Sequence, residues 1–181
     1  MNFCPNCGAR VARRIPDGDH LARDVCDACG QVHYDNPKLI AGCVPEHDGR
    51  ILLCRRAIEP RLGFWTIPAG FMEIGETLAE AAARECREEA LAHVEIEDLC
   101  AIVHVLQSAQ VHVMFRARLA DPTYGVGAES LETRLYLEEA VPWHELAFPS
   151  VRFTLERWFQ DRRSGRRSLH FTTIERRLAA G

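Results

Sequence analysis

Three glutamates lie close together in a segment of good helix formers that contains neither glycine nor proline. Glu85, Glu88 and Glu89 stand at positions i, i+3 and i+4, which places their carboxylates on one face of a helix. Like charges at this spacing destabilise a helix by roughly a few tenths of a kcal/mol per pair. A hard divalent cation such as Mg2+ would offset the repulsion and could bridge to substrate phosphates. The alternative is a solvated acidic face that pairs with Arg84 and Arg87.

Four cysteines near the N-terminus form two pairs. Cys4 and Cys7 are followed, after eighteen residues, by Cys26 and Cys29, and a glycine comes directly after each pair. This spacing is typical of a four-cysteine zinc site. One alternative is two disulfides, which a reducing cytoplasm disfavours. The other is four free thiols, and thiols paired in this way in a segment with so few core residues are hard to explain without metal. Because a closed shell of four thiolates leaves no open position for catalysis, we expect Zn2+ to stabilise this segment.

Composition narrows the class of protein. The chain has 181 residues, 47% of them hydrophobic and 27% charged, with a net charge of −4. These values are typical of a soluble globular protein and disfavour a globally basic nucleic-acid binder. No apolar run approaches the roughly 18 residues of a membrane span, and the N-terminal residues lack the apolar segment of a signal peptide. We therefore expect a cytoplasmic protein without a membrane partner.

Two domains are expected because the amino-acid composition changes along the chain. Residues 1–36 have few large apolar residues and many turn formers, so they cannot build a core without a bound metal. Pro37 then interrupts any regular element. We place a small zinc-binding module at 1–36 and a larger domain at 37–181.

The larger domain reads as a mixture of strands and two helices. Thr77 and Glu80 form a capping-box signature at the start of a helix over 77–90. A second, amphipathic helix follows Pro149. The apolar residues that recur there at helical intervals are Val151, Leu155, Trp158 and Phe159. Apolar runs typical of strands lie at 39–45, 51–56, 64–68, 100–106, 111–119 and 133–137.

The glutamates belong to a longer pattern. Gly70, then Glu76 after five residues, then R-E-C-R-E-E from Arg84 after seven more, resembles the Nudix box, G-x5-E-x7-R-E-U-x-E-E-x-G-U with U apolar. One fixed position differs, because Leu91 stands where the box has its last glycine. That glycine normally ends the helix in a left-handed conformation, so the sequence leaves open where this helix ends.

Resemblance to Nudix hydrolases implies an α+β fold, namely an α/β/α sandwich with a mixed sheet, after the zinc ribbon. It also implies metal-dependent hydrolysis of a nucleoside diphosphate linked to another moiety, and a homodimer would be ordinary for the superfamily. By position, Glu85 and Glu89 would be the main Mg2+ or Mn2+ ligands. Glu88 would assist them, and the Ala69 carbonyl would be a further ligand.

Other roles follow from the same resemblance. Glu76 and Arg84 would form a structural pair that fixes the box loop to the helix. A general base in Nudix proteins often comes from a loop outside the box, where this chain offers Glu129 and Glu132. We favour Glu129 as the base or extra metal ligand. The alternative is that both are ordinary loop acids.

A closer resemblance covers most of the chain. The segments FCPNCG, HYDNPK, PAGFME, ESLE and LHFTTI are similar to zinc-ribbon Nudix hydrolases related to the plant chloroplast FAD pyrophosphatase. This implies hydrolysis of FAD to FMN and AMP, with ADP-ribose as the second candidate. NADH ranks lower because the SQPWPFP-type signature of NADH pyrophosphatases is missing. The absence of proline from residues 101–121 argues weakly against dedicated ADP-ribose activity.

Three residues are candidates for binding the substrate. Arg55 and Arg56 could contact diphosphate oxygens, and Trp65 could stack on an aromatic ring of a nucleotide. The alternatives are surface arginines and a core tryptophan. A function of another class would be an RNA-binding or ligand-sensing regulatory Nudix protein. Residues 1–38 carry five basic and five acidic side chains, which disfavours nucleic acid as a partner.

Overall fold

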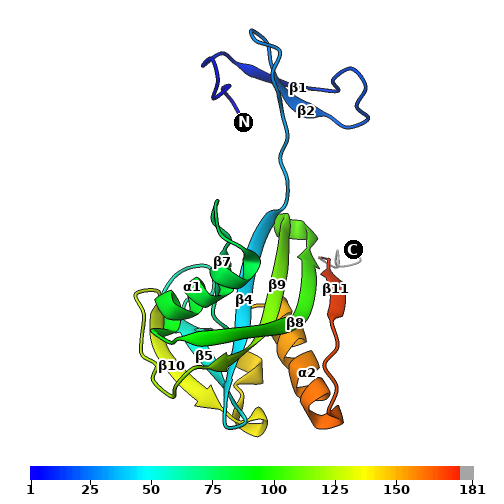
Figure 1. Cartoon of the computed structure of the whole chain (residues 1–181). Coiled ribbons are helices and arrows are strands. Elements are labelled where there is room, and N and C mark those ends of the chain that lie inside the picture. Colours follow the sequence, from blue (N-terminus) through cyan, green and yellow to red (C-terminus); the bar gives the residue numbers. More distant parts are fainter. Residues whose placement is uncertain (176–181) are drawn as a thin grey trace. The chain divides into compact units, whose positions relative to one another are not determined.

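The computed structural model describes residues 1–175, which fall into two compact units (Figure 1). The first unit comprises Met1–Asn36, and the second begins at Pro37. The first contains an antiparallel sheet with strands β1 (Val11–Arg14), β2 (Arg23–Cys26) and β3 (Val32–His33). Its buried hydrophobic residues are Cys4, Val25 and Cys26 alone. Such a small core cannot hold a fold of this size together without an additional crosslink.

The second unit is built on one mixed sheet. Its main strands run in the order β10-β5-β4-β9-β8-β11, with β6 paired to β5 and β7 to β4. The pairs β4–β9 and β8–β11 are parallel, and the others are antiparallel. The strands are β4 (Lys38–His47), β5 (Arg50–Arg56), β6 (Trp65–Thr66), β7 (Ala69–Phe71), β8 (Val94–Val105), β9 (Gln110–Leu119), β10 (Ser130–Tyr136) and β11 (His170–Ile174).

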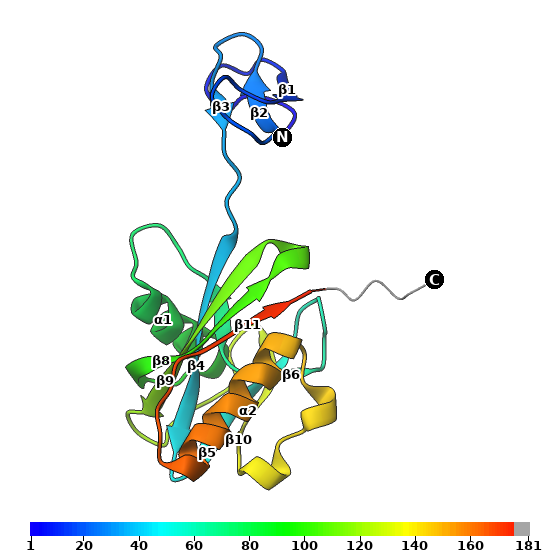
Figure 2. The same cartoon turned by 90° about the vertical axis from the view of Figure 1, so that its right-hand side faces the viewer.

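Two helices cover opposite faces of this sheet, α1 (Leu78–Ala90) and α2 (Pro149–Ser164) (Figures 1 and 2). Side chains of β5 alternate between the faces. Leu52 belongs to the buried cluster that includes α1, whereas Ile51 and Leu53 belong to the cluster that includes α2. This is the expected α/β/α sandwich. Short 3-10 turns η1 (Leu106–Ser108), η2 (Glu138–Ala140) and η3 (Trp143–Glu145) complete the unit.

Both predicted helices are confirmed. Thr77 is the N-cap of α1: its side chain accepts the Glu80 N–H at 3.2 Å, and the Glu80 carboxylate accepts the Thr77 N–H at 2.7 Å. In α2 the expected apolar face is buried, with Leu155 at 0% and Phe159 at 1% exposure. Neither helix within residues 1–175 is long and apolar enough to cross a membrane.

Leu91 ends α1 at the place where the box glycine would end it. Its backbone is left-handed, with φ 50° and ψ 29°, and its N–H donates to the Arg87 carbonyl at 3.0 Å. This conformation destabilises a residue with a Cβ by about 1 kcal/mol or more. The helix therefore ends normally, but with local strain.

The strand predictions were incomplete. Strand β8 begins at Val94, six residues before the predicted run at 100, and β7 and β11 were not predicted. In the missed part of β8 the half-buried Val94 and Ile96 alternate with the exposed Glu95 and Glu97. This alternation is the usual sign of a strand with one face in the core. Strand β11 pairs in parallel with β8, and no local pattern specifies a partner so distant in sequence.

Candidate active site and zinc site

Glu85 and Glu89 face the interior of the protein, not solvent. Their exposures are 9% and 6%, whereas Glu88 is exposed. Burial raises the pKa of both inner carboxyls, and that of Glu89 reaches about 8, with the Glu85 charge as a second cause. The alternative of a solvated acidic face therefore holds only for Glu88.

The carboxylate of Glu85 occupies space that Gly70 leaves free. A Cβ at residue 70 would lie 2.3 Å from the Glu85 carboxyl carbon, which no real contact allows. Gly70 is in β7, which pairs with β4 and contacts α1. The box glycine thus allows the helix carboxylate to lie directly against the strand.

Arg84 joins the box loop to the helix, as the resemblance implied. It donates from Nε and one terminal nitrogen to the two Glu76 oxygens at 3.0 and 2.8 Å. Its other terminal nitrogen donates to Glu85 at 2.7 Å and to Glu88 at 3.0 Å. Pairing with Arg84 lowers the pKa of Glu76 to about 2. Arg84 therefore fixes the loop and orients the Glu85 carboxylate in one arrangement.

Glu89 has an unsatisfied oxygen. Its Oε2 is buried and has no hydrogen-bond partner among the described residues. The charges of Glu85 and Glu129 also raise its pKa, while Arg56 and a backbone contact with Ala69 oppose them. A buried, unpartnered carboxylate oxygen among other carboxylates is the environment that a hard divalent cation relieves. The chemistry of these donors suits such an ion, whereas among the described residues the four cysteines alone bring three or more ligand atoms within 4.8 Å of one another.

Of the two candidate bases, Glu129 is the exposed one whose charge acts on the inner carboxylates. Its charge raises the pKa of both Glu85 and Glu89. Glu132 lies on β10 opposite Arg55 and forms ion pairs with Arg134 at 2.8 Å and with Arg55 at 4.0 Å. These arginines hold Glu132 along the strand.

The two candidate arginines differ in position. Arg56 lies near enough to Glu89 to lower its pKa, donates from Nε to the Pro60 carbonyl at 2.9 Å, and stacks on the Phe148 ring at 5.2 Å. Arg55 donates to the Gly63 carbonyl at 2.9 Å and faces Glu132. Arg56 thus borders the carboxylate cluster.

The stacking role expected for Trp65 conflicts with the structure. Trp65 is 5% exposed, belongs to the core cluster under α2, and packs edge-on against Tyr136 with ring centroids 5.2 Å apart. The ring is enclosed because β6 pairs with β5 and directs it into the core. An aromatic residue that sequence reasoning missed is Phe148, which lies under Arg56.

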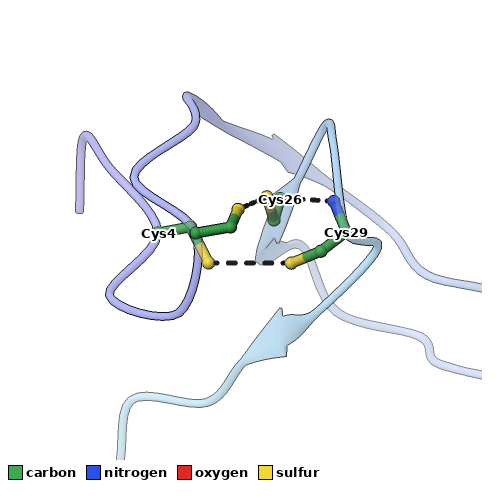
Figure 3. A group of neighbouring side chains, drawn as sticks. Cys4, Cys26 and Cys29 are labelled. Atoms are coloured by element: carbon green, nitrogen blue, oxygen red, sulfur yellow. Dashed lines mark hydrogen bonds between the residues drawn. The ribbon is translucent and has the colours of Figure 1, made fainter.

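The four cysteines of the first unit form a compact cluster (Figure 3). Their sulfur atoms all lie within 4.8 Å of one another, with Cys4–Cys29 at 3.8 Å and Cys7–Cys26 at 3.4 Å. No disulfide links them, so the disulfide alternative does not hold. Backbone amides of residues 28 and 29 lower the pKa of Cys26 to about 6. These features fit a tetrahedral thiolate site for Zn2+.

Tight turns that end at the two glycines present each pair of thiols. The Gly8 N–H donates to the Cys4 carbonyl at 2.9 Å, and the Gly30 N–H donates to the Cys26 carbonyl at 3.1 Å. Both glycines have φ above 70°, a conformation that other residues rarely adopt.

Comparison with known proteins agrees with this arrangement. Residues 2–35 match the family model of a zinc ribbon described as Nudix N-terminal, and residues 37–160 match the NUDIX domain. The chain belongs to the Nudix hydrolase family. A crystal structure of a Nudix hydrolase from Nitrosomonas europaea is 46% identical with a TM-score of 0.91, covering 96% of this chain and 100% of that one.

Curated Nudix relatives match over shorter segments. The NAD-capped RNA hydrolase NudC of Vibrio atlanticus is 36% identical over 95 residues, which is 49% of this chain and 31% of the relative. The ADP-ribose pyrophosphatase of Methanocaldococcus jannaschii is 41% identical over 56 residues, which is 31% of this chain and 33% of the relative. The matches thus span about a third of the length of these two relatives.

Proposed function

We propose that this Nudix protein hydrolyses the diphosphate bond of a dinucleotide, with FAD, cleaved to FMN and AMP, as the first candidate. ADP-ribose is the second candidate. The observation that carries the proposal is the buried, unpartnered Oε2 of Glu89, whose pKa the charges of Glu85 and Glu129 also raise. These three carboxylates, one with an unsatisfied oxygen, would bind a divalent cation that also holds a diphosphate.

The residues that would hold Mg2+ or Mn2+ are Glu85 and Glu89, helped by Glu88 and the Ala69 carbonyl. When bound, the ion would neutralise diphosphate oxygens and lower the pKa of a coordinated water. The unpartnered Glu89 oxygen and the cradle opposite Gly70 support this assignment. Glu89 Oε2 has no competing partner among the described residues, and Glu85 has Arg84 on one of its two oxygens.

Protein side chains would supply binding and proton transfer. Arg56, held by its bond to Pro60, would orient the diphosphate through its remaining N–H groups. Glu129 would accept a proton from the attacking water. The water oxygen then bonds to one phosphorus, the bond from that phosphorus to the bridging oxygen breaks, and the second phosphate leaves with that oxygen.

The choice of substrate rests on two kinds of similarity. FAD is favoured by the sequence motifs shared with FAD pyrophosphatases. ADP-ribose and an NAD-type substrate are favoured by the names of the relatives from M. jannaschii and V. atlanticus. FAD, ADP-ribose and NAD all contain adenosine diphosphate joined to another group. The NudC match therefore adds an NAD-type dinucleotide, free or at an RNA end, as the further candidate.

Product analysis tests the proposal. Zinc-replete protein is incubated with Mg2+ or Mn2+ and with FAD, ADP-ribose, NADH or a dinucleoside polyphosphate in separate reactions, and the products are separated by chromatography. We expect FMN and AMP from FAD, at a higher kcat/KM than any other substrate gives. Faster cleavage of ADP-ribose or NADH would keep the reaction and change the substrate.

Two variants show whether the activity belongs to this site. Glu89→Gln keeps the side-chain shape but removes the charge, and we expect at least about a hundredfold loss of kcat. Glu139→Gln removes an exposed glutamate of η2, outside the carboxylate cluster, and serves as the control. Full activity of Glu89→Gln, or inactivity of the wild type on every substrate, would contradict the proposed function.

A further inference from the structure

Leu91 adopts a conformation suited to glycine at the position where the Nudix box has glycine. Its φ is 50°, so a glycine there would relieve strain. Its side chain is 55% exposed, so burial in the core does not account for a leucine either. The Leu91 side chain instead makes a contact outside the core, which a glycine at position 91 could not make.

That contact is with Gly125. A Cβ at residue 125 would lie 3.1 Å from Leu91 Cδ1 and 3.5 Å from Leu91 Cβ. The leucine side chain therefore lies against the backbone at Gly125, in space that most side chains at 125 would need. Residue 91 is leucine where the Nudix box has glycine, and residue 125, which the Leu91 side chain contacts, is glycine.

Gly125 lies in the loop at 120–129, which connects β9 to β10 and is hydrogen-bonded to the end of α1. The Gly125 N–H donates to the Ala90 carbonyl at 2.7 Å, and the Gly127 N–H donates to the Glu89 carbonyl at 3.1 Å. A Cβ at residue 127 would lie 1.8 Å from the Glu88 carbonyl oxygen. The loop is thus tied, backbone to backbone, to the helical turn that carries the metal-site glutamates.

Two residues further along, this loop presents Glu129. The Ala57 N–H donates to the Glu129 carbonyl at 2.8 Å, and the Ser130 N–H closes the turn on the Gly127 carbonyl at 3.1 Å. The position of Glu129 relative to Glu85 and Glu89 therefore depends on how closely the loop follows the helix end. The Leu91 side chain contacts this loop from α1 at Gly125, and on the β10 side the Thr133 hydroxyl donates to the Gly125 carbonyl at 2.8 Å.

We propose that Leu91 and Gly125 are a complementary pair of positioning residues, which hold the Glu129 loop against the end of α1. Neither residue touches the reacting atoms. The inference deepens the proposed function, since it rests on Glu129 acting beside the metal site. Leu91 therefore keeps a strained backbone conformation, while its side chain fixes the loop that carries Glu129, the proposed base.

Two substitutions at residue 91 distinguish the effect of the side-chain contact from the effect of the backbone strain. Leu91→Ala removes the contact but keeps a Cβ in the left-handed conformation, and Leu91→Gly removes both. We expect kcat to fall about tenfold in both variants with little change in KM, because only the loop is misplaced. We expect Tm to be higher in Leu91→Gly than in Leu91→Ala. Ala109→Gly, at another left-handed residue with φ 49° in the β8–β9 turn, controls for strain relief alone.

Amide hydrogen exchange provides a readout independent of activity. In both Leu91 variants the amides of Gly125 and Gly127 should exchange faster, while those of the α1 interior stay unchanged. Wild-type kcat together with wild-type exchange at these amides would overturn the inference. If the wild type cleaves no diphosphate, the proposed function fails, and the exchange rates alone decide whether Leu91 holds the loop.

A double-mutant cycle tests the pair itself. Gly125→Ala places a methyl group against Leu91, so it should lower Tm in the wild type and lower it less in the Leu91→Gly background. Additive changes in Tm would show that the two positions are independent and would overturn the pairing.

Discussion

The carboxylate of Glu85 lies where a side chain at Gly70 would be, 2.3 Å from the position of its Cβ. Gly70→Ala must therefore displace Glu85 or separate β7 from α1. We expect a loss of about 1–3 kcal/mol in the free energy of unfolding and a clear rise in the Mg2+ concentration needed for half-maximal activity. Urea unfolding and metal titration measure the two effects. If a folded Gly70→Ala protein needed the same Mg2+ concentration as the wild type, the space beside Gly70 would not be what positions the Glu85 carboxylate for metal binding.

Arg84 is a second point at which loop, helix and metal site depend on one side chain. Arg84→Ala leaves Glu76 and Glu85 without their charged partner, so we expect the metal-free protein to lose about 3 kcal/mol of stability. Saturating Mg2+ should restore part of this loss, because a cation beside Glu85 replaces the guanidinium charge. Arg84→Lys should recover less than the full stability because lysine cannot bind both Glu76 oxygens in the same way. Equal destabilisation with and without Mg2+ would contradict this account.

The raised pKa of Glu89 predicts a pH dependence of a definite sign. In the metal-free protein this carboxyl has a pKa of about 8, against about 4.3 in an unfolded chain. Between these values the folded state binds more protons, so the contribution of Glu89 to stability falls as pH rises from 5 to 9. Urea unfolding in magnesium-free buffer that leaves zinc in place measures the slope.

Glu89→Gln supplies the control for that slope. The variant should be more stable than the wild type at pH 9, and the difference should shrink toward pH 5. Since the cation needs the ionised carboxylate, Mg2+ affinity of the wild type should rise over the same pH range. A difference between variant and wild type that does not change with pH would refute the assignment.

The cysteine cluster predicts one Zn2+ per chain with a structural role. Cys26→Ser should abolish stoichiometric zinc and the amide protection of residues 1–36, because this unit buries few apolar side chains. Cys100→Ser, at a buried cysteine of β8 outside the cluster, is the control and should retain zinc. Elemental analysis and hydrogen exchange on the full chain check both statements. Retention of zinc by Cys26→Ser would exclude the four-thiolate site.

Trp65 should behave as a core residue. Trp65→Ala is expected to cost about 3–5 kcal/mol of stability, whereas Trp65→Phe, which keeps a ring against Tyr136, should leave KM for FAD within about twofold of the wild type. If Trp65→Phe raises KM strongly at unchanged stability, the ring contacts the substrate after all.

Local patterns in the sequence determined the parts of this protein that depend on neighbours along the chain. The capping pair Thr77 and Glu80, the cysteine turns and the amphipathic face of α2 are formed by residues a few positions apart, so spacing alone predicts them. The Nudix box is of the same kind, because its chemistry lies on one loop and one helix.

Only the tertiary structure decided which of these groups meet. It turned Glu85 and Glu89 inward and left Glu88 exposed, and it brought Glu129 near enough for its charge to raise their pKa values. It also buried Trp65 and brought Phe148 under Arg56. These outcomes depend on which helix face packs on the sheet and on contacts between segments far apart in sequence. The burial that raises the pKa of Glu89 comes from the same packing, so spacing alone could not have predicted it.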